Sequence, residues 1–341
     1  RPTNLAAELK RSEGRIASVS TRADYLRIEN LAALASLLPP GPARRTLEAL
    51  APRGELFGLD ATITVAKPGV VPDVDGRVRF TELGFEPLGK APGLQGLDGS
   101  IEGRGAGGVV QLATRDALVT WPLQWRALAE LKRADGRLEW SRFQDGVRLW
   151  LDDAVIETGH GNTRGSIRLL LRPGELPLLD LRASVAGFDA TQTWRYLPIG
   201  KIKPKSLGWL DAAFRSGRVV DAQVSITGPT RGFPYREEQG RFHAEARVAG
   251  LTLFYAPGWP EIRGIDADLV FDGPGMRALA RRGLLAGVAI TQAEASSADM
   301  RDAILAVRAS LRGDAGGAIR LLQASPLAPS LGSAFGELTG S

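Results

Sequence analysis

The sequence contains no cysteine and only two histidines among its 341 residues. The absence of cysteine excludes disulfide bonds, thiolate metal ligands and a cysteine nucleophile. His160 and His243 have no partner at metal-ligand spacing, and neither belongs to a visible Ser-His-Asp arrangement. We therefore predict that both histidines lie on the surface, and that the chain has no catalytic site, no metal site and no cofactor.

Long apolar runs and a strong charge imbalance are also missing. No stretch approaches the roughly 20 apolar residues that a membrane-spanning helix needs, and the sequence shows no signal peptide. Its 43 basic and 38 acidic residues are mixed along the chain, unlike the one-sided excess of a nucleic-acid-binding protein. We expect no nucleic-acid partner. Because the first residue is Arg1 and not methionine, we expect the chain to be a segment of a longer protein.

Glycine and proline are abundant, at 41 and 21 residues, which favours many short strands joined by turns. Apolar and charged residues alternate along most of the chain, for example over residues 241–248. Successive side chains of a strand point to opposite faces, so the pattern predicts an antiparallel sheet with one apolar and one charged face. Hairpin connections are predicted at Asp135-Gly136, at Asp145-Gly146 and over residues 159–165.

The apolar face of such a sheet has to be hidden from water. A second sheet, closure into a barrel, or a trough that holds an apolar ligand would each hide it. Alternation alone does not choose between them, although a lining of Ala, Val and Leu in a chain with only 6% aromatic residues favours the trough. The residues predicted to line this face are Leu97, Ile101, Leu138, Trp140, Val147, Leu149, Leu151, Ile167, Leu169, Leu171, Phe242, Ala244, Val248, Ile265, Leu269 and Phe271.

One supersecondary unit occurs twice in the sequence. At an offset of 168 residues, Gly96 aligns with Gly264 and Asp98 with Asp266, and residues 47–64 align with residues 210–227 at a slightly shorter offset. We predict a first unit over residues 1–125, connecting strands over 126–187 and a second unit over 188–341. Short helices are predicted at residues 31–37, 43–50, 191–196, 207–214 and 317–324, several of them ended by proline.

The second copy closely resembles the central region of the YhdP-type proteins, which belong to the AsmA-like group of Gram-negative envelope proteins. The first copy matches more loosely, through the phrase LAPRGELFGL. The motifs that carry the resemblance are Tyr196-Leu197-Pro198, Trp209-Leu210, Gly217, Phe233-Pro234, Gly240-Arg241-Phe242, Tyr255-Ala256-Pro257-Gly258-Trp259-Pro260 and Phe271-Asp272-Gly273.

The resemblance implies a mainly β fold, in which a long curled antiparallel sheet forms an apolar groove (the repeating β-groove) with a few short helices. It implies a periplasmic location, with the full-length protein anchored in the inner membrane and contacting outer-membrane components. It also implies a role in moving phospholipids, whose acyl chains the groove would hold, between the inner and outer membranes.

Two other functions remain open at this point. One is a scaffold or interaction module that aids outer-membrane assembly, with the apolar face filled by the protein itself. The other is a hydrolase on a β scaffold, for which the pair Asp266 and Asp268 would supply the carboxylates. A solvated outer face is the simpler interpretation of that pair. The basic loop of Lys201, Lys203 and Lys205 could touch acidic head groups or a partner, although most such runs are only solvated.

Overall fold

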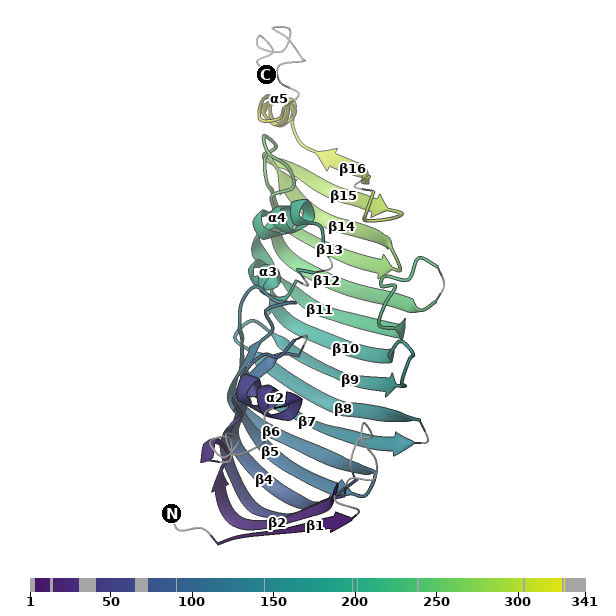
Figure 1. Ribbon diagram of the computed structural model, residues 1–341. Coiled ribbons are helices and arrows are strands. Elements are labelled where there is room, and N and C mark those ends of the chain that lie inside the picture. Colours follow the sequence, from purple (N-terminus) through teal and green to yellow (C-terminus); the bar gives the residue numbers. More distant parts are fainter. Residues whose placement is uncertain are drawn as a thin grey trace. The chain divides into compact units, whose positions relative to one another are not determined.

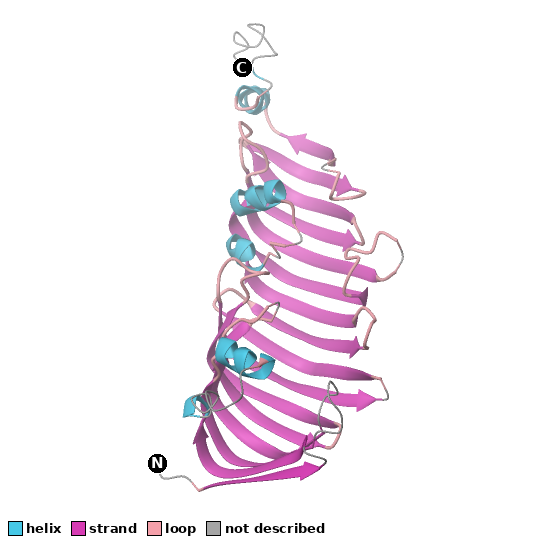
Figure 2. Ribbon diagram, in the orientation of Figure 1, coloured by secondary structure: helices cyan, strands magenta, loops and turns pink. Residues whose placement is uncertain are grey.

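The computed structural model describes residues 4–12, 15–30, 41–64, 73–89, 91–143, 145–197, 199–200, 202–237, 239–302, 304–326 and 328. These residues form one 16-stranded sheet in which each strand pairs with its neighbours in sequence order, and the first and last strands do not meet. Every pairing for which a register is given is antiparallel, as in β5 with β6 and β12 with β13. The predicted fold class, a long antiparallel sheet with a few short helices, is therefore confirmed (Figures 1 and 2).

The strands are long for a globular protein. Their bounds are β1 Leu5–Ser12, β2 Arg15–Arg27, β3 Arg53–Thr64, β4 Asp73–Phe85, β5 Gly93–Arg104, β6 Gly107–Thr120, β7 Ala129–Phe143, β8 Gly146–Thr158, β9 Asn162–Leu171, β10 Leu178–Asp189, β11 Phe214–Pro229, β12 Arg241–Leu253, β13 Ile262–Asp272, β14 Gly275–Leu285, β15 Val288–Ser297 and β16 Ala306–Arg312.

The helices lie at the positions that the sequence predicts, within two or three residues. They are α2 Pro42–Leu50, η2 Ala190–Gln192, α3 Thr193–Tyr196, α4 Pro204–Ala213 and α5 Ala315–Gln323. Proline occupies the first turn of α2 and α4, where its missing N–H costs no hydrogen bond. The prediction for residues 31–37 lies outside the described residues.

Connections between strands alternate between the two margins of the sheet. We call one the helical margin, because the connections β2–β3 and β10–β11 lie there and contain α2, η2, α3 and α4. We call the other the turn margin. It carries the short turns β5–β6, β7–β8 and β13–β14 and the longer loops β11–β12 and β15–β16. The described residues separate into two compact units. Unit 1 comprises residues 1–159 and 163–181, and unit 2 comprises residues 160–162 and 182–341. The three-part division of the sequence stays a prediction.

Positive backbone φ angles recur towards the helical margin of many strands. They occur at Gly96 (77°) in β5, Asp116 (56°) in β6, Gly250 (62°) in β12 and Gly264 (63°) in β13. The strand registers shift at or beside these positions. Such bulges add a residue to one strand, bend it and increase its twist. They account for the curl of the strands within each unit (Figure 1).

The two aligned copies make the same backbone contacts. The carboxylate of Asp98 accepts the N–H of Glu82 at 2.9 Å, and that of Asp266 accepts the N–H of Gly250 at 2.9 Å. The N–H of Glu86 donates to Leu50 at 2.8 Å, as the N–H of Phe254 does to Ala213 at 2.8 Å. The bulges of the two copies are thus capped by equivalent acidic side chains.

One predicted hairpin is wrong. Asp135 and Gly136 lie inside β7, and not in a turn. Gly136 allows close packing, because a Cβ built on it would lie 3.0 Å from Cδ1 of Leu151 in β8. The turn at Asp145 is present between β7 and β8, whereas residues 159–165 contain a short turn followed by the start of β9.

A stability series tests the close approach of strands at Gly217, whose φ is 108°. A Cβ built there would lie 2.5 Å from Cα of Leu251 on the neighbouring strand, so Gly217→Ala has to push β11 and β12 apart. We expect a loss of about 2 kcal/mol or more in the free energy of unfolding, measured by urea denaturation.

Two matched variants separate crowding from backbone strain. Gly264→Ala meets no atom and carries only the cost of its positive φ, about 1 kcal/mol. Gly208→Ala lies inside α4 in open space and should stabilise by about 0.5 kcal/mol or more. Equal losses for Gly217→Ala and Gly264→Ala would contradict the crowding argument.

Candidate functional site

The candidate site is the apolar face of the sheet. Residues directly opposite each other in an antiparallel pair point to the same face. In unit 1 the register therefore places one row of aliphatic side chains across β4 to β8: Val78, Ile101, Val110, Leu138 and Leu151. Three members of this row, Ile101, Leu138 and Leu151, were predicted from the sequence, and the structure brings them into one row. The other two members, Val78 and Val110, were not predicted.

Aromatic rings lie flat on this face over glycines. A Cβ built on Gly108 would lie 2.3 Å from the ring of Trp140, and one built on Gly99 would lie 2.7 Å from the ring of Phe80. Both glycines are on strands next to the aromatic residue, directly opposite it in the register. The missing side chains of the two glycines leave the space that these rings occupy.

Unit 2 continues the pattern with smaller residues. The register aligns two adjacent rows across β11 to β15. One is Ala222, Ala246, Leu269, Ala278 and Ala295, and the other is Val219, Val248, Ala267, Ala280 and Ala293. The predicted residues Ala244 and Phe271 lie opposite each other in the next row towards the turn margin, and Phe242 lies one row further, opposite Ile226.

Exposure divides the sixteen predicted residues into two groups. Leu97, Val248 and Ile265 are buried, at 8%, 5% and 7% exposed. The other thirteen are half-buried, which is the state expected of side chains that pack against neighbours in the sheet and have no second layer above them. They are Ile101, Leu138, Trp140, Val147, Leu149, Leu151, Ile167, Leu169, Leu171, Phe242, Ala244, Leu269 and Phe271.

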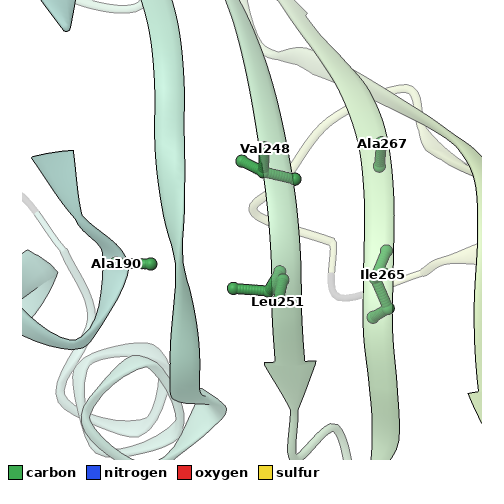
Figure 3. Close-up of a cluster of buried hydrophobic side chains, with 5 residues drawn as sticks. All are labelled: Ala190, Val248, Leu251, Ile265 and Ala267. Carbon is green, nitrogen blue, oxygen red and sulfur yellow. The ribbon is translucent and has the colours of Figure 1, made fainter. Parts of the chain in front are cut away.

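The buried residues lie towards the helical margin, where the protein covers its own sheet. In unit 2, Ala190 of η2 packs with Val248 and Leu251 of β12 and with Ile265 and Ala267 of β13 (Figure 3). This small core anchors the connection β10–β11 to the sheet. It also removes Val248 and Ile265 from contact with a ligand, so the thirteen half-buried residues carry the candidate site.

Arginine and acidic side chains cover the opposite face. Cross-strand pairs include Arg22 with Asp60 at 2.9 Å, Arg115 with Asp135 at 2.9 Å and Arg277 with Glu294 at 2.9 Å. Exposed pairs of this kind contribute little to stability. Their consequence here is that this face stays hydrated, and the aliphatic rows lie on the other face.

The acidic pair Asp266 and Asp268 belongs to this charged face. Arg282 donates to Asp266, and Arg281 donates to Asp268. The Arg282 guanidinium, followed by the Gly250 N–H, holds the pKa of Asp266 below its usual range. A general acid needs a raised pKa, so the structure favours the solvated-face interpretation of this pair.

The two histidines also have partners. Nδ1 of His160 lies 3.0 Å from the hydroxyl of Tyr196, and Nε2 of His243 lies 3.1 Å from Glu245. Among the described residues, no three His, Cys, Asp or Glu side chains are grouped closely enough to hold a metal ion. Within the same ranges, no helix combines the length and the apolar character needed to cross a membrane.

The most distinctive sequence motif, Tyr255 to Pro260, forms the turn between β12 and β13. The indole N–H of Trp209 in α4 donates to the carbonyl of Tyr255 at 2.9 Å, and the rings of Tyr255 and Trp259 lie 5.9 Å apart. Burial raises the pKa of the Tyr255 hydroxyl. The motif therefore pins α4 to the helical margin.

A long antiparallel sheet that is apolar on one face, charged on the other and unclosed defines the chain as a β-sheet protein built to present an extended apolar surface. The family model described as "YhdP protein" matches residues 2–341, and the chain belongs to this family. The predicted family resemblance is thus confirmed.

One curated relative is the "Intermembrane phospholipid transporter YhdP" of Escherichia coli (strain K12), which is 22% identical over 259 residues. The match covers 76% of this chain and 20% of the relative, so the chain spans about a fifth of that protein's length. No solved structure matches the chain.

The electrostatics of the charged face can be tested at Asp266. Because Arg282 is the largest cause of its lowered pKa, Arg282→Met should raise that pKa towards the usual value near 3.9. The control Arg281→Met removes only a weaker long-range interaction and should raise the pKa less. Carboxyl chemical shifts followed by NMR from about pH 2 to pH 6 give both values. The same pKa in both variants would contradict the assignment.

The lowered pKa of Asp266 also determines how its contribution to stability depends on pH. A carboxyl group whose folded pKa is lowered stabilises the fold above its unfolded pKa, near 3.9, and loses that contribution as the pH falls through the folded pKa. Arg282→Met should therefore reduce the acid sensitivity of unfolding below about pH 4.

Proposed function

We propose that this chain is one segment of a conduit that carries phospholipids across the periplasm between the inner and outer membranes, with the acyl chains held along the apolar face. The full-length protein would be anchored in the inner membrane and would contact outer-membrane components. The observation that carries the proposal is the row of half-buried aliphatic side chains that crosses β4 to β8, over which the described residues form no second sheet. Membership of the YhdP family and the name of the relative support the choice of cargo.

The energetics suit a conduit better than a tight binding site. Two acyl chains of a phospholipid contain about 32 methylene and methyl groups, and exposing them to water costs on the order of 25 kcal/mol at about 0.8 kcal/mol per group. A continuous apolar surface removes that cost at every step of the path. Because the lining is aliphatic and repetitive, neighbouring positions bind hydrocarbon about equally, and a lipid can slide from one strand to the next.

The charged face and the polar turns leave the head group in water. The path runs across the strands in sequence order, and its width is the length of a strand. It therefore becomes longer with each added pair of strands. This arrangement needs no catalytic group and no cofactor, and the chain acts as a non-enzymatic carrier.

A scaffold with a self-filled core is the competing function, favoured locally by the packing of Ala190 on the sheet of unit 2. That packing involves the buried residues near the helical margin. Of the thirteen half-buried residues only Leu269 packs against this cluster, and the other twelve lie outside it. Native mass spectrometry of the purified chain separates the two functions. Copurified phospholipid supports the conduit, and a lipid-free mass with no uptake of fluorescent phospholipid supports the scaffold.

Photo-crosslinking tests which face holds the lipid. Leu169 and Arg168 are neighbours in β9, but Leu169 is half-buried on the predicted lipid face and Arg168 is exposed. With a photoreactive residue at each position in turn and phospholipid vesicles as the probe, we expect adducts at position 169 only. Equal labelling of both positions would count against the assigned faces.

A charge placed on the apolar face should interrupt the path. Leu138→Lys puts an ammonium group into the row between Val110 and Leu151. An unpaired charge against hydrocarbon costs several kcal/mol, so uptake of fluorescent phospholipid from vesicles should fall by about tenfold or more. Arg137→Lys, one residue away on the charged face, is the matched control and should leave uptake unchanged. A fall of the same size in both variants would indicate a general folding defect, which circular dichroism would detect.

A further inference from the structure

In unit 2, a helix bridges from one margin of the sheet to the other. The C-terminal end of α4 continues directly into β11 at the helical margin. At its N-terminal end, Nζ of Lys203 donates to the carbonyl of Arg301 at 3.4 Å, and Arg301 lies in the loop β15–β16 at the turn margin. The ten residues of α4 measure about 15 Å along the helix axis. We call residues 203–213 the strap.

The loop that receives the strap is firmly held. Both oxygens of Asp299 accept from the guanidinium of Arg236, at 2.7 and 2.8 Å, and Asp299 also accepts the backbone N–H of Arg301 at 2.8 Å. The side chains of Arg236 and Asp299 are only 24% and 18% exposed. The Arg236 guanidinium holds the pKa of Asp299 far below its usual range, so this pair stays charged at any physiological pH. The loops β11–β12 and β15–β16 are thereby tied together.

The strap itself is held unevenly. Its C-terminal residue Ala213 is fully buried, and Trp209 is tethered through its hydrogen bond to Tyr255. All four residues from Lys203 to Ser206 are exposed. The contact between Lys203 and Arg301 is longer than the usual 2.7–3.2 Å of an N–H···O bond, is exposed, and has an uncharged acceptor. The N-terminal end of the strap is therefore the part that can be released.

We propose that the strap closes the open side of the apolar face in unit 2, and that Lys203 is a catch released by the phosphate of a passing phospholipid. The inference rests on the proposed function. A lipid that slides with its chains on the sheet keeps its head group at the open side, where the strap stands in its way. An ammonium group forms a stronger bond with a phosphate than with a backbone carbonyl, because the hydrogen bond is then charged on both sides. Lys203 thus leaves the carbonyl of Arg301 and binds the phosphate of the head group. The N-terminal end of the strap is then free to move aside.

The absence of cysteine makes a direct test simple. In the variant Lys203→Cys with Arg301→Cys, a short bis-maleimide can react only at these two positions and locks the strap to the loop. A photoreactive residue at Leu269 reports lipid in unit 2, where β13 lies in strand order between the attachment of the strap and the loop that receives it. A photoreactive residue at Leu138 reports lipid in unit 1. Vesicles of fluorescent phosphatidylethanolamine supply the probe.

Locking should lower the rate of adduct formation at position 269 about tenfold, as closure of a lid does for access to a site, and leave position 138 unchanged. A matched lock across the charged face, Asp221→Cys with Arg247→Cys on β11 and β12, should change neither rate. Undiminished labelling at 269 in the locked strap overturns the proposal. If neither position is labelled before locking, the lipid-conduit function itself fails, and the two failures are distinguishable.

A second pair of variants tests the catch. Lys203→Met keeps the length of the side chain and removes its donors, so uncharged diacylglycerol should reach position 269 as fast as phospholipid does. In the wild-type chain and in Lys205→Met, whose substitution lies two residues further on in the first turn of α4, phospholipid should remain about tenfold faster than diacylglycerol. The same ratio in all three chains would overturn the role of Lys203.

Discussion

The alternation of side chains along a strand is the constraint on which the rest of this structure depends. Each strand has to offer one apolar and one charged face, and sixteen strands joined in sequence order bring these faces into register. The sheet then has no second sheet to pack against among its described residues. The aliphatic row across β4 to β8 and the row Ala222, Ala246, Leu269, Ala278 and Ala295 across β11 to β15 pack against their neighbours in the sheet and remain half-buried.

Bulges bend the strands of this sheet, and the helical connections cover part of one margin. The positive φ angles of Gly96 and Gly264 and their partners in adjacent strands bend the strands near the helical margin, and Asp98 and Asp266 satisfy the N–H groups that the bulges expose. On the inner side of the bend, the connection β10–β11 contributes Ala190 to a small core. In unit 2 the protein thus covers part of the helical margin with its own side chains.

Much of this arrangement could be predicted from the sequence. Periodicity of two assigned faces to residues such as Leu138 and Arg137, and prolines placed the short helices. What could not be predicted depends on contacts between distant residues. The positive φ of Glu82 has no signal in residue type, that of Asp116 has only the weak preference of aspartate for the left-handed region, and the bulges there shift the alternation by one position. The burial of Val248 by Ala190 and the bond from Lys203 to Arg301 join residues far apart in the chain, so no local pattern reveals them. Asp135-Gly136 misled the prediction because a glycine that admits a neighbouring Leu looks, in sequence, like a glycine that makes a turn.

The helical connections follow strands β2, β10 and β16, and all three strand numbers are even. In an up-and-down sheet, every even strand finishes on the same side. An insertion or loss of a single strand during evolution would move every later helix from the helical margin to the turn margin. Such a sheet is therefore expected to gain or lose strands in pairs, because only whole hairpins keep the helices after even-numbered strands.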